Sequence, residues 1–164
     1  MDATTEIRPF GPADLTILQQ IRHAAFEPVF RSFRAIVGAE IYRHAFADAD
    51  AEQARLLEDM CAAGSGHTLF VATINGRIVG FVSFTLNGAT RTGEIGLNAV
   101  HPDHAGQGIG TAMYEFVMAR MKRSGMAVAT VGTGGDPGHL PARRAYEKAG
   151  FGPAVPSLYY YKLL

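Results

Sequence analysis

Three glycines alternate in the stretch HAGQGIGT, residues 104–111, directly before a segment with helical periodicity. A glycine inside a helix costs roughly 1 kcal/mol relative to alanine, so this placement needs a compensating role. The first N–H groups of a helix have no partner within the helix, and glycines let a preceding loop turn further N–H groups toward the same point. The stretch is therefore typical of a site where backbone N–H groups hold a phosphate-like anion. A tight strand-to-helix turn without a ligand is the alternative that the glycines alone leave open.

The two common nucleotide-binding glycine motifs do not fit this stretch. No Gly-Lys-Ser/Thr follows it, as a Walker A loop would require. Its spacing is Gly-x-Gly-x-Gly, and no acidic residue for a ribose stands about twenty residues further on in a following strand. The stretch has no lysine or arginine, so the backbone itself would have to hold the anion.

The segment GEIGLNAV, residues 93–100, precedes the glycines and has the composition of a strand. Since side chains alternate between the two faces of a strand, one face should carry an acid, a glycine and an amide: Glu94, Gly96 and Asn98. The opposite face should carry Ile95, Leu97 and Ala99. An acid and an amide beside a glycine suggest a groove in which chemistry takes place. A solvated outer face of the strand is the alternative.

Further polar candidates stand near the C-terminal end. Tyr146 lies in PARRAYEKAGF, residues 141–151, and a tyrosine is a proton donor at neutral pH without any shift of its pKa. His139 and Asp136 lie in the preceding loop, GTGGDPGHLP. Each of these residues also has a purely structural interpretation. Tyr146 would then be an aromatic residue of the core, His139 a residue at the entry of the helix, and Asp136 a turn residue before Pro137.

The elements that position these residues follow from periodicity and turn signals. Asn75-Gly76 between two β-rich runs is a strong hairpin signal. The N-terminal part should form a strand at Thr5–Phe10, a helix at Leu15–Phe26 and less regular helical segments from Pro28 to Ala63. Three strands should follow, at 67–74, 77–84 and 93–100. The C-terminal part should form a helix at Thr111–Arg123, a strand at 126–133, a helix at Pro141–Ala149 and a last strand at 155–163. This pattern predicts one α/β domain over residues 1–164, with a mixed, largely antiparallel central sheet flanked by helices.

Composition excludes several classes of function. Fifteen basic residues balance fifteen acidic ones, so the basic excess typical of nucleic-acid binding is missing, and we expect no nucleic-acid partner. The single cysteine, Cys61, allows no intrachain disulfide, which fits a cytoplasmic protein. The N-terminal sequence has no apolar leader, and no apolar run is long enough to cross a bilayer, so we expect no membrane partner. The histidines do not occur at metal-ligand spacing, and we expect no metal.

Two segments carry a resemblance to a known family. HPDHAGQGIG, residues 101–110, resembles the acyl-CoA pyrophosphate loop of the GNAT superfamily of N-acetyltransferases, with its pattern Arg/Gln-x-x-Gly-x-Gly/Ala after a strand. PARRAYEKAGF resembles the second signature of the family, a helix with tyrosine followed by Glu-Lys-x-Gly-Phe. The two signatures have the order and spacing of the family, and the predicted strand order agrees with it. The resemblance therefore covers nearly the whole chain and is weakest from Pro28 to Gly66, where members differ to suit their acceptors.

The resemblance implies that the co-substrate is acetyl-CoA. Backbone N–H groups of the loop and of the first helical turn would hold its pyrophosphate: Ala105, Gly106, Gln107, Gly108, Ile109, Gly110 and Thr111. Ala105 departs from the family, where arginine is common at this position. The pantetheine arm would pair with the strand beside Asn98, Ala99 and Val100, and the Asn98 N–H would polarise the thioester carbonyl. His139 stands where many members have asparagine, and it could contact the pantetheine or serve as an alternative base.

The resemblance also implies the two proton carriers of the reaction. Glu94 matches the catalytic glutamate of the histone-type branch, in the context Glu-Ile-x-x-x-Ala, and would act as general base if its carboxylate is buried. Tyr146 matches the usual general acid, which protonates the leaving thiolate. No cysteine lies near the signatures, so the acetyl group should pass directly to the amine within a ternary complex; Cys61 is expected to be a small buried hydrophobic residue.

The expected function is transfer of an acetyl group from acetyl-CoA to a primary amine of a small molecule or peptide. Residues Phe26 to Phe46 are rich in aromatics and poor in acids, unlike an acidic funnel for polyamines or aminoglycosides. A cytoplasmic homodimer is expected from the family alone. A non-catalytic acyl-CoA-binding or sensing module would keep the glycine loop and lose the proton carriers. A general nucleotide- or phosphate-binding α/β protein is the third possibility.

Overall fold

Five strands form one sheet whose spatial order follows the chain, β1-β2-β3-β4-β5. The computed structural model of the protein describes residues 4–164. The strands are β1 (Glu6–Pro9), β2 (Thr68–Ile74), β3 (Arg77–Asn87), β4 (Thr92–Val100) and β5 (Val128–Val131). The pairs from β1 to β4 are antiparallel, and β4 and β5 are parallel. The predicted mixed, largely antiparallel sheet is confirmed, and Asn75 and Gly76 turn the β2–β3 hairpin with positive φ angles of 51° and 76°.

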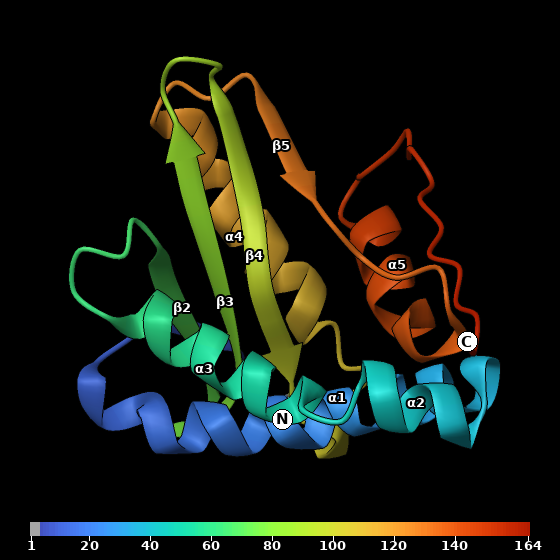
Figure 1. Cartoon of the computed structure of the whole chain (residues 1–164). Helices are drawn as coiled ribbons and strands as arrows, with labels where there is room; N and C mark the ends of the chain where they lie inside the picture. Colours follow the sequence, from blue (N-terminus) through green and yellow to red (C-terminus); the bar gives the residue numbers. More distant parts are fainter. Residues whose placement is uncertain (1–3) are drawn as a thin grey trace.

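Helices cover both faces of this sheet (Figure 1). They are α1 (Leu15–Val37), α2 (Ala39–Ala45), α3 (Ala49–Cys61), α4 (Ile109–Arg123) and α5 (Leu140–Lys148), with short 3-10 turns η1 (Pro12–Asp14), η2 (Pro102–His104) and η3 (Pro137–His139). One core lies between the sheet and α4 and α5, and a second lies between the sheet and α1 and α3. The two cores give β4 two different environments, one on each face.

Helix α1 is longer than the sequence predicts. The predicted helix ends at Phe26 and a less regular helical segment follows from Pro28, but α1 continues without a break to Val37. Pro28 lies inside it although a proline has no N–H group for the helical hydrogen bond. Val29, just past the proline, is 5 % exposed, and η3 packs closely against the same turn. Burial of Val29 and the packing of η3 against this turn therefore outweigh the local preference for a stop.

The segment after α5 is not a strand. The aromatic and aliphatic run 155–163 predicts one, but residues 149–164 are in no helix or strand, and most of the tail from Gly152 is exposed. The prediction is wrong because composition measures how well residues suit a sheet, whereas a strand also needs an edge with which to pair. In this structure the tail lies against α2, where the ring centroids of Tyr161 and Phe46 are 5.5 Å apart.

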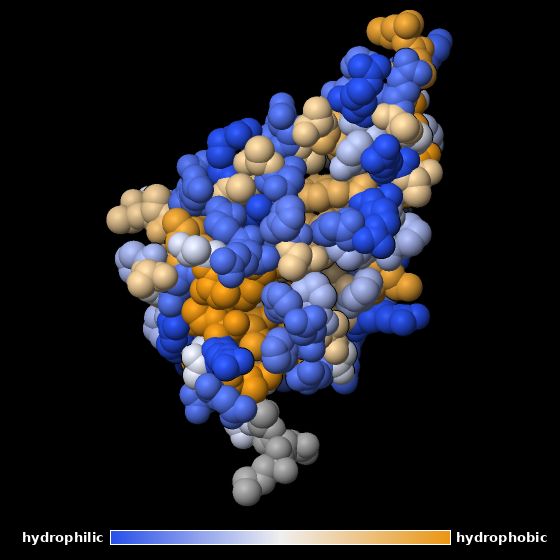
Figure 2. Space-filling model, turned by 90° about the horizontal axis from the view of Figure 1, so that it is seen from below, coloured by the Kyte–Doolittle hydropathy of each residue, from blue (hydrophilic) through white to orange (hydrophobic). Residues whose placement is uncertain are grey.

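The outer surface of the molecule carries both polar and apolar residues. Seen from below, polar residues surround an exposed apolar patch (Figure 2). Among the helices of residues 4–164, none has the length and apolar character that a membrane span requires.

Candidate active site

A β-bulge in β4 decides which side chains of this strand come together. Ile95 pairs with Phe84 of β3 and Asn98 pairs with Val82, so two β4 residues, Gly96 and Leu97, lie opposite the single residue Ser83. The Ser83 hydroxyl donates a 2.9 Å hydrogen bond to the Leu97 carbonyl at this point. The bulge interrupts the strict alternation of faces along β4.

Glu94 and Asn98 therefore lie on opposite faces of the sheet, and their predicted common face is wrong. Ile95 belongs to the core on the α4 and α5 side, so Glu94, its neighbour in the chain, points to the α1 and α3 side. Beyond the bulge, Leu97 and Ala99 pack on the α1 and α3 side, and Asn98 faces α4 and α5.

The amide of Asn98 joins two buried tyrosines. Its Nδ2 donates to the Tyr146 hydroxyl at 3.0 Å and to the Gly96 carbonyl at 3.0 Å, and its Oδ1 accepts from the Tyr114 hydroxyl at 2.8 Å. The rings of Tyr114 and Tyr146 pack with centroids 4.7 Å apart, and Tyr146 is 6 % exposed. The site thus holds the Tyr146 phenol in one orientation beside β4.

Burial keeps both phenols protonated. It raises the pKa of Tyr146, although the hydrogen bonds with Asn98 and Tyr114 oppose the shift. It also raises the pKa of Tyr114, and the neighbouring Tyr146 adds to the effect. Sequence reasoning missed Tyr114, whose only signal was its place among the buried positions of α4.

One edge of β4 is open beside this network. Pairing between β4 and β5 ends at Ile95 and Val131, and no strand among the described residues 4–164 continues it beside residues 96–100 of β4. Figure 1 shows β5 diverging from β4 toward α5. Unpaired backbone groups of a strand can bind an extended ligand as an additional strand would. Asn98, Ala99 and Val100, predicted to line the pantetheine arm, all lie on this open segment.

The glycine loop follows the same end of β4. Gly106 and Gly108 have φ angles of 75° and 79°, in the left-handed region that favours glycine. Helix α4 begins at Ile109, two residues earlier than predicted, and Ile109 anchors it with 2 % exposure. Within residues 4–164, the N–H groups of Gly106, Gln107 and Gly108 donate to no other residue. These N–H groups and those of the first α4 turn, through Gly110 and Thr111, are free for an anion.

Glu94 and Cys61 differ in their surroundings. Glu94 is exposed, so the burial that the general-base hypothesis required is missing; its carboxylate shares no hydrogen bond with another residue in the described chain.

Cys61 packs at the edge of the α1 and α3 core, and burial raises the pKa of its thiol to about 11. A thiol in that state is a poor nucleophile at neutral pH.

His139 and Asp136 form a close pair at η3. Their Nδ1 and Oδ1 atoms are 2.5 Å apart, with side chains 18 % and 7 % exposed. Burial opposes ionisation of Asp136, but hydrogen bonds from His139 and Ser32 outweigh it and hold the pKa of the carboxyl below its usual value. Ser32 was not singled out in the sequence, and only the docking of η3 on α1 places it here.

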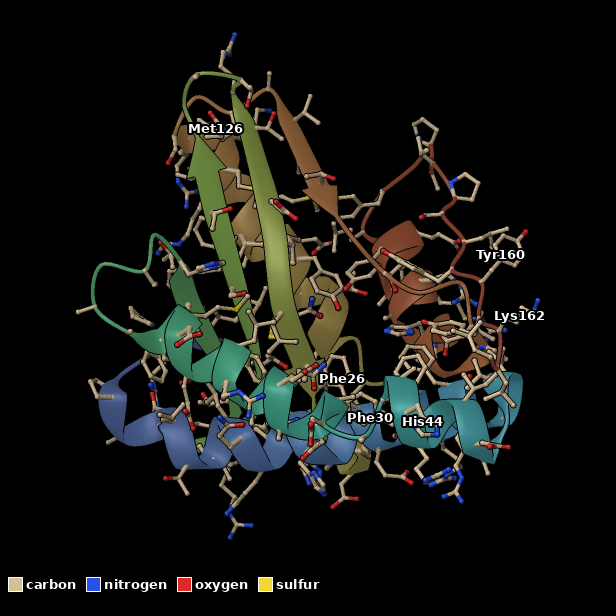
Figure 3. All side chains as sticks on the ribbon, viewed as in Figure 1. Phe26, Phe30, His44, Met126, Tyr160 and Lys162 are labelled. Carbon is tan, nitrogen blue, oxygen red and sulfur yellow. The ribbon has the colours of Figure 1, made fainter. Side chains whose placement is uncertain are left out.

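Aromatic rings extend from His139 across α1 and α2. This aromatic cluster comprises Phe26, Phe30, Phe33, Tyr42 and Phe46, with neighbouring ring centroids 5.3 to 6.5 Å apart. The His139 ring lies 6.5 Å from Phe26 and 6.0 Å from Phe33. Figure 3 shows Phe26 and Phe30 on α1 near the lower end of β4, facing the α5 region.

Two hollows on the surface of the described chain lie apart from this site. They are lined by the α1–α2 junction and by α2 with the tail, and neither includes a residue of β4 or α5. Within residues 4–164, no three His, Cys, Asp or Glu side chains gather as metal ligands would.

Comparison with known proteins agrees with this arrangement. The profile of the Acetyltransferase (GNAT) family matches residues 33–151. A protein assigned to the GNAT family from Desulfovibrio desulfuricans superposes with a TM-score of 0.70 at 20% identity, covering 93% of this chain and 87% of that chain.

Two further solved structures are similar. The ribosomal-protein-S18-alanine N-acetyltransferase from Escherichia coli gives a TM-score of 0.64 at 21% identity, covering 93% of this chain and 80% of that one. The PaiA N-acetyltransferase from Thermoplasma acidophilum, in complex with coenzyme A, gives 0.66 at 16% identity, with 88% of each chain covered. No curated protein matches the chain by sequence. The profile match over most of the chain, on a fold shared with these structures, shows that the chain belongs to the GNAT acetyltransferase family.

Proposed function

We propose that this protein is an N-acetyltransferase that transfers an acetyl group from acetyl-CoA directly to a primary amine of a small molecule or peptide. The observation that carries the proposal is the hydrogen bond between Asn98 and Tyr146 beside the open edge of β4. It places a protonated phenol next to a strand edge that can hold an extended thioester arm. A non-catalytic sensing module would not need an oriented proton donor at this point.

Binding of acetyl-CoA is assigned to backbone groups. The N–H groups from Gly106 to Thr111 hold the pyrophosphate at the start of α4, with the left-handed Gly106 and Gly108 shaping the turn. The Ala105 N–H, predicted to join them, already donates a 3.0 Å hydrogen bond to the Pro102 carbonyl. The pantetheine arm extends along residues 98–100 of β4. Because the loop directly follows β4, one continuous surface serves both parts of the co-substrate.

The reaction needs charge stabilisation and proton transfers. The neutral amine attacks the thioester carbonyl, a C–N bond forms, and the Asn98 N–H stabilises the developing oxyanion. The C–S bond then breaks, and the Tyr146 hydroxyl donates its proton to the departing thiolate. Glu94 is exposed on the α1 and α3 face and lacks the burial that a general base would need, so no step of the reaction is assigned to it.

The acceptor is proposed to reach the thioester from the side of the aromatic cluster. Phe26 of this cluster packs against the core that contains Ala99 of β4. Aromatic faces bind apolar groups and cationic amines. They therefore favour an amine carried on an apolar or aromatic body. By family analogy, the enzyme works as a single-domain protein, as a homodimer in the cytoplasm.

The test is release of coenzyme A thiol from acetyl-CoA with a panel of small primary amines and peptides, on wild type and Tyr146→Phe. Amine-dependent release that falls sharply in the variant supports the proposal. Binding of acetyl-CoA without release with any amine favours the sensing module. Tight binding of ATP or NAD without binding of acetyl-CoA would favour a general nucleotide-binding protein.

A further inference from the structure

Asp136 fixes the orientation and proton position of the His139 ring. The carboxylate is 7 % exposed, accepts a 2.9 Å hydrogen bond from the Gly138 N–H, and lies 2.5 Å from His139 Nδ1. An ionised carboxylate only accepts hydrogen bonds, so Nδ1 must carry the proton. Nε2 of the neutral ring is then the acceptor nitrogen, as in other carboxylate–histidine pairs.

Surrounding contacts hold this pair rigidly. Arg143 of α5 donates to the carbonyl oxygens of Gly134 and Asp136 at 2.6 and 2.7 Å and so fixes the loop that carries the carboxylate. The Gly138 N–H also lies 3.3 Å from the Ser32 hydroxyl of α1. Nε2 of His139 has no hydrogen-bond partner among residues 4–164. This nitrogen is therefore free to accept a proton from a bound molecule.

The pair lies next to the proposed acetyl site. His139 ends η3 and is the N-cap of α5, and Tyr146 lies seven residues further on, about 10 Å along the helix axis. Tyr146 contacts Asn98 from one face of β4. On the other face, Phe26 packs in the core with Leu97 and Ala99 and also contacts the His139 ring. Tyr146 thus contacts the open segment of β4 directly, and Phe26 links the His139 ring to the core on the other face of β4.

The His139 ring has one carboxylate and two aromatic rings as neighbours. The Asp136 carboxylate contacts it from the η3 loop, and α1 presents the rings of Phe26 and Phe33. The Arg143 guanidinium of α5 binds the backbone carbonyls of Gly134 and Asp136 in the same loop. The Glu27–Arg31 pair of α1 is exposed and its members bond to each other. Glu94, the other candidate base, is exposed and has no such orienting partner.

We infer that His139 is the general base of the transfer reaction and that Asp136 is its positioning residue. This inference rests on the proposed function. Nε2 takes the proton that the acceptor nitrogen loses as its bond to the acetyl carbon forms, and the Asp136 carboxylate stabilises the resulting imidazolium. Tyr146 supplies the proton that the coenzyme A thiolate gains. His139 therefore gains one proton and Tyr146 loses one in each turnover. Proton exchange with solvent then restores both groups.

The experiment compares kcat for thiol release as a function of pH in wild type, His139→Gln, Asp136→Asn and Glu94→Gln. Saturating amine is used because kcat then reports groups in the ternary complex. Two acceptor amines of different basicity separate an enzyme group from the acceptor, since a limb of the profile that belongs to the amine moves between them. Calorimetry with acetyl-CoA alone, and a circular dichroism melt, measure binding and folding of every variant.

For His139→Gln we expect kcat to fall about 100-fold or more, with acetyl-CoA affinity unchanged within about threefold. The acidic limb of the pH profile, which is the fall of kcat toward low pH, should disappear in this variant. Asp136→Asn should lower kcat about tenfold and displace the acidic limb, because the ring loses its fixed tautomer. Glu94→Gln should retain kcat within about threefold and keep the limb. These results together support the assignment.

Three outcomes would overturn it. In the first, folded His139→Gln keeps the same acidic limb as the wild-type enzyme. In the second, Glu94→Gln loses the limb. In the third, the limb of the wild-type enzyme moves with the basicity of the amine, so that it belongs to the acceptor. Absence of amine-dependent release by wild-type protein is a different result, because it overturns the proposed acetyltransferase function itself.

Discussion

The Asn98 amide lies 3.0 Å from the Tyr146 hydroxyl, although the two residues are 48 positions apart in the chain. Asn98 reaches Tyr146 because the bulge at Gly96 and Leu97 turns it from the face of Glu94 to the face of α4 and α5. The bulge also coincides with the end of the β4–β5 pairing at Ile95. The bulge therefore brings the orienting amide to the proton donor at the point where the strand edge opens.

Replacing the Tyr146 hydroxyl should remove the proton donor. For Tyr146→Phe we expect kcat for amine-dependent thiol release to fall about 100-fold, with acetyl-CoA affinity little changed. Since burial raises the pKa of Tyr146, the wild-type enzyme should keep its active, protonated phenol to pH values above about 10 and lose activity as pH rises through that raised pKa. A pH–rate profile of both proteins measures this.

Tyr114→Phe is the matched control for this prediction. It removes the other phenol that bonds to Asn98, at 2.8 Å, but leaves the Tyr146 hydroxyl in place. We expect a smaller loss of kcat and a stability cost of about 1 kcal/mol. Equal effects of the two substitutions on kcat would contradict a special role for Tyr146.

Left-handed glycines of the anion loop should not tolerate a side chain. For Gly106→Ala and Gly108→Ala, the positive φ costs about 1–2 kcal/mol, and relief of that strain would turn N–H groups away from the pyrophosphate. We expect acetyl-CoA to bind about five- to thirtyfold more weakly, as measured by isothermal titration calorimetry.

Gly125→Ala controls for strain alone. Gly125 has a φ of 83° and open space for a Cβ, but it lies at the opposite end of α4 from the anion loop. The substitution should lower the melting temperature and leave acetyl-CoA affinity unchanged. If it weakens binding as much as Gly106→Ala does, the loop has no specific role in holding the anion.

Asp136 should contribute pH-dependent stability. Because its folded-state pKa is lowered, its contribution is present above the unfolded value of about 4 and is lost as pH falls through the folded pKa. Asp136→Asn should cost about 1–3 kcal/mol at pH 7, and the difference from wild type should vanish in strong acid. Denaturant unfolding at several pH values measures this, and a constant difference across the range would refute it.

Close packing of η3 on α1 should make Gly138 intolerant of a methyl group. A Cβ there would lie 2.7 Å from the Val29 Cα and 2.9 Å from the Pro28 carbonyl oxygen. Because these are backbone atoms that cannot move aside, Gly138→Ala should destabilise the fold by about 1–3 kcal/mol. Gly135→Ala, with open space around its Cβ, is the control, and equal melting temperatures of the two variants would show that this contact is not tight.

The sequence by itself determined those features that depend on short-range chemistry. Asn75-Gly76 specified the hairpin because few residues adopt its positive φ angles, and periodicity placed α4 and α5 to within two residues. The glycines before α4 and the tyrosine of α5 were sufficient to indicate the family, which the profile match then showed. These signals are local, and each can be recognised from a few neighbouring residues.

Only the tertiary structure decided which of these residues meet. The continuation of α1 through Pro28, the lack of a strand in the tail and the docking of His139 under Phe26 all depend on what lies beside a segment rather than on its composition. The bulge is the clearest case. Strict alternation assigns Glu94 and Asn98 to one face, but one extra residue opposite Ser83 reverses every side chain beyond it. Pairing with β3 imposes that extra residue, and no pattern within β4 alone reveals it.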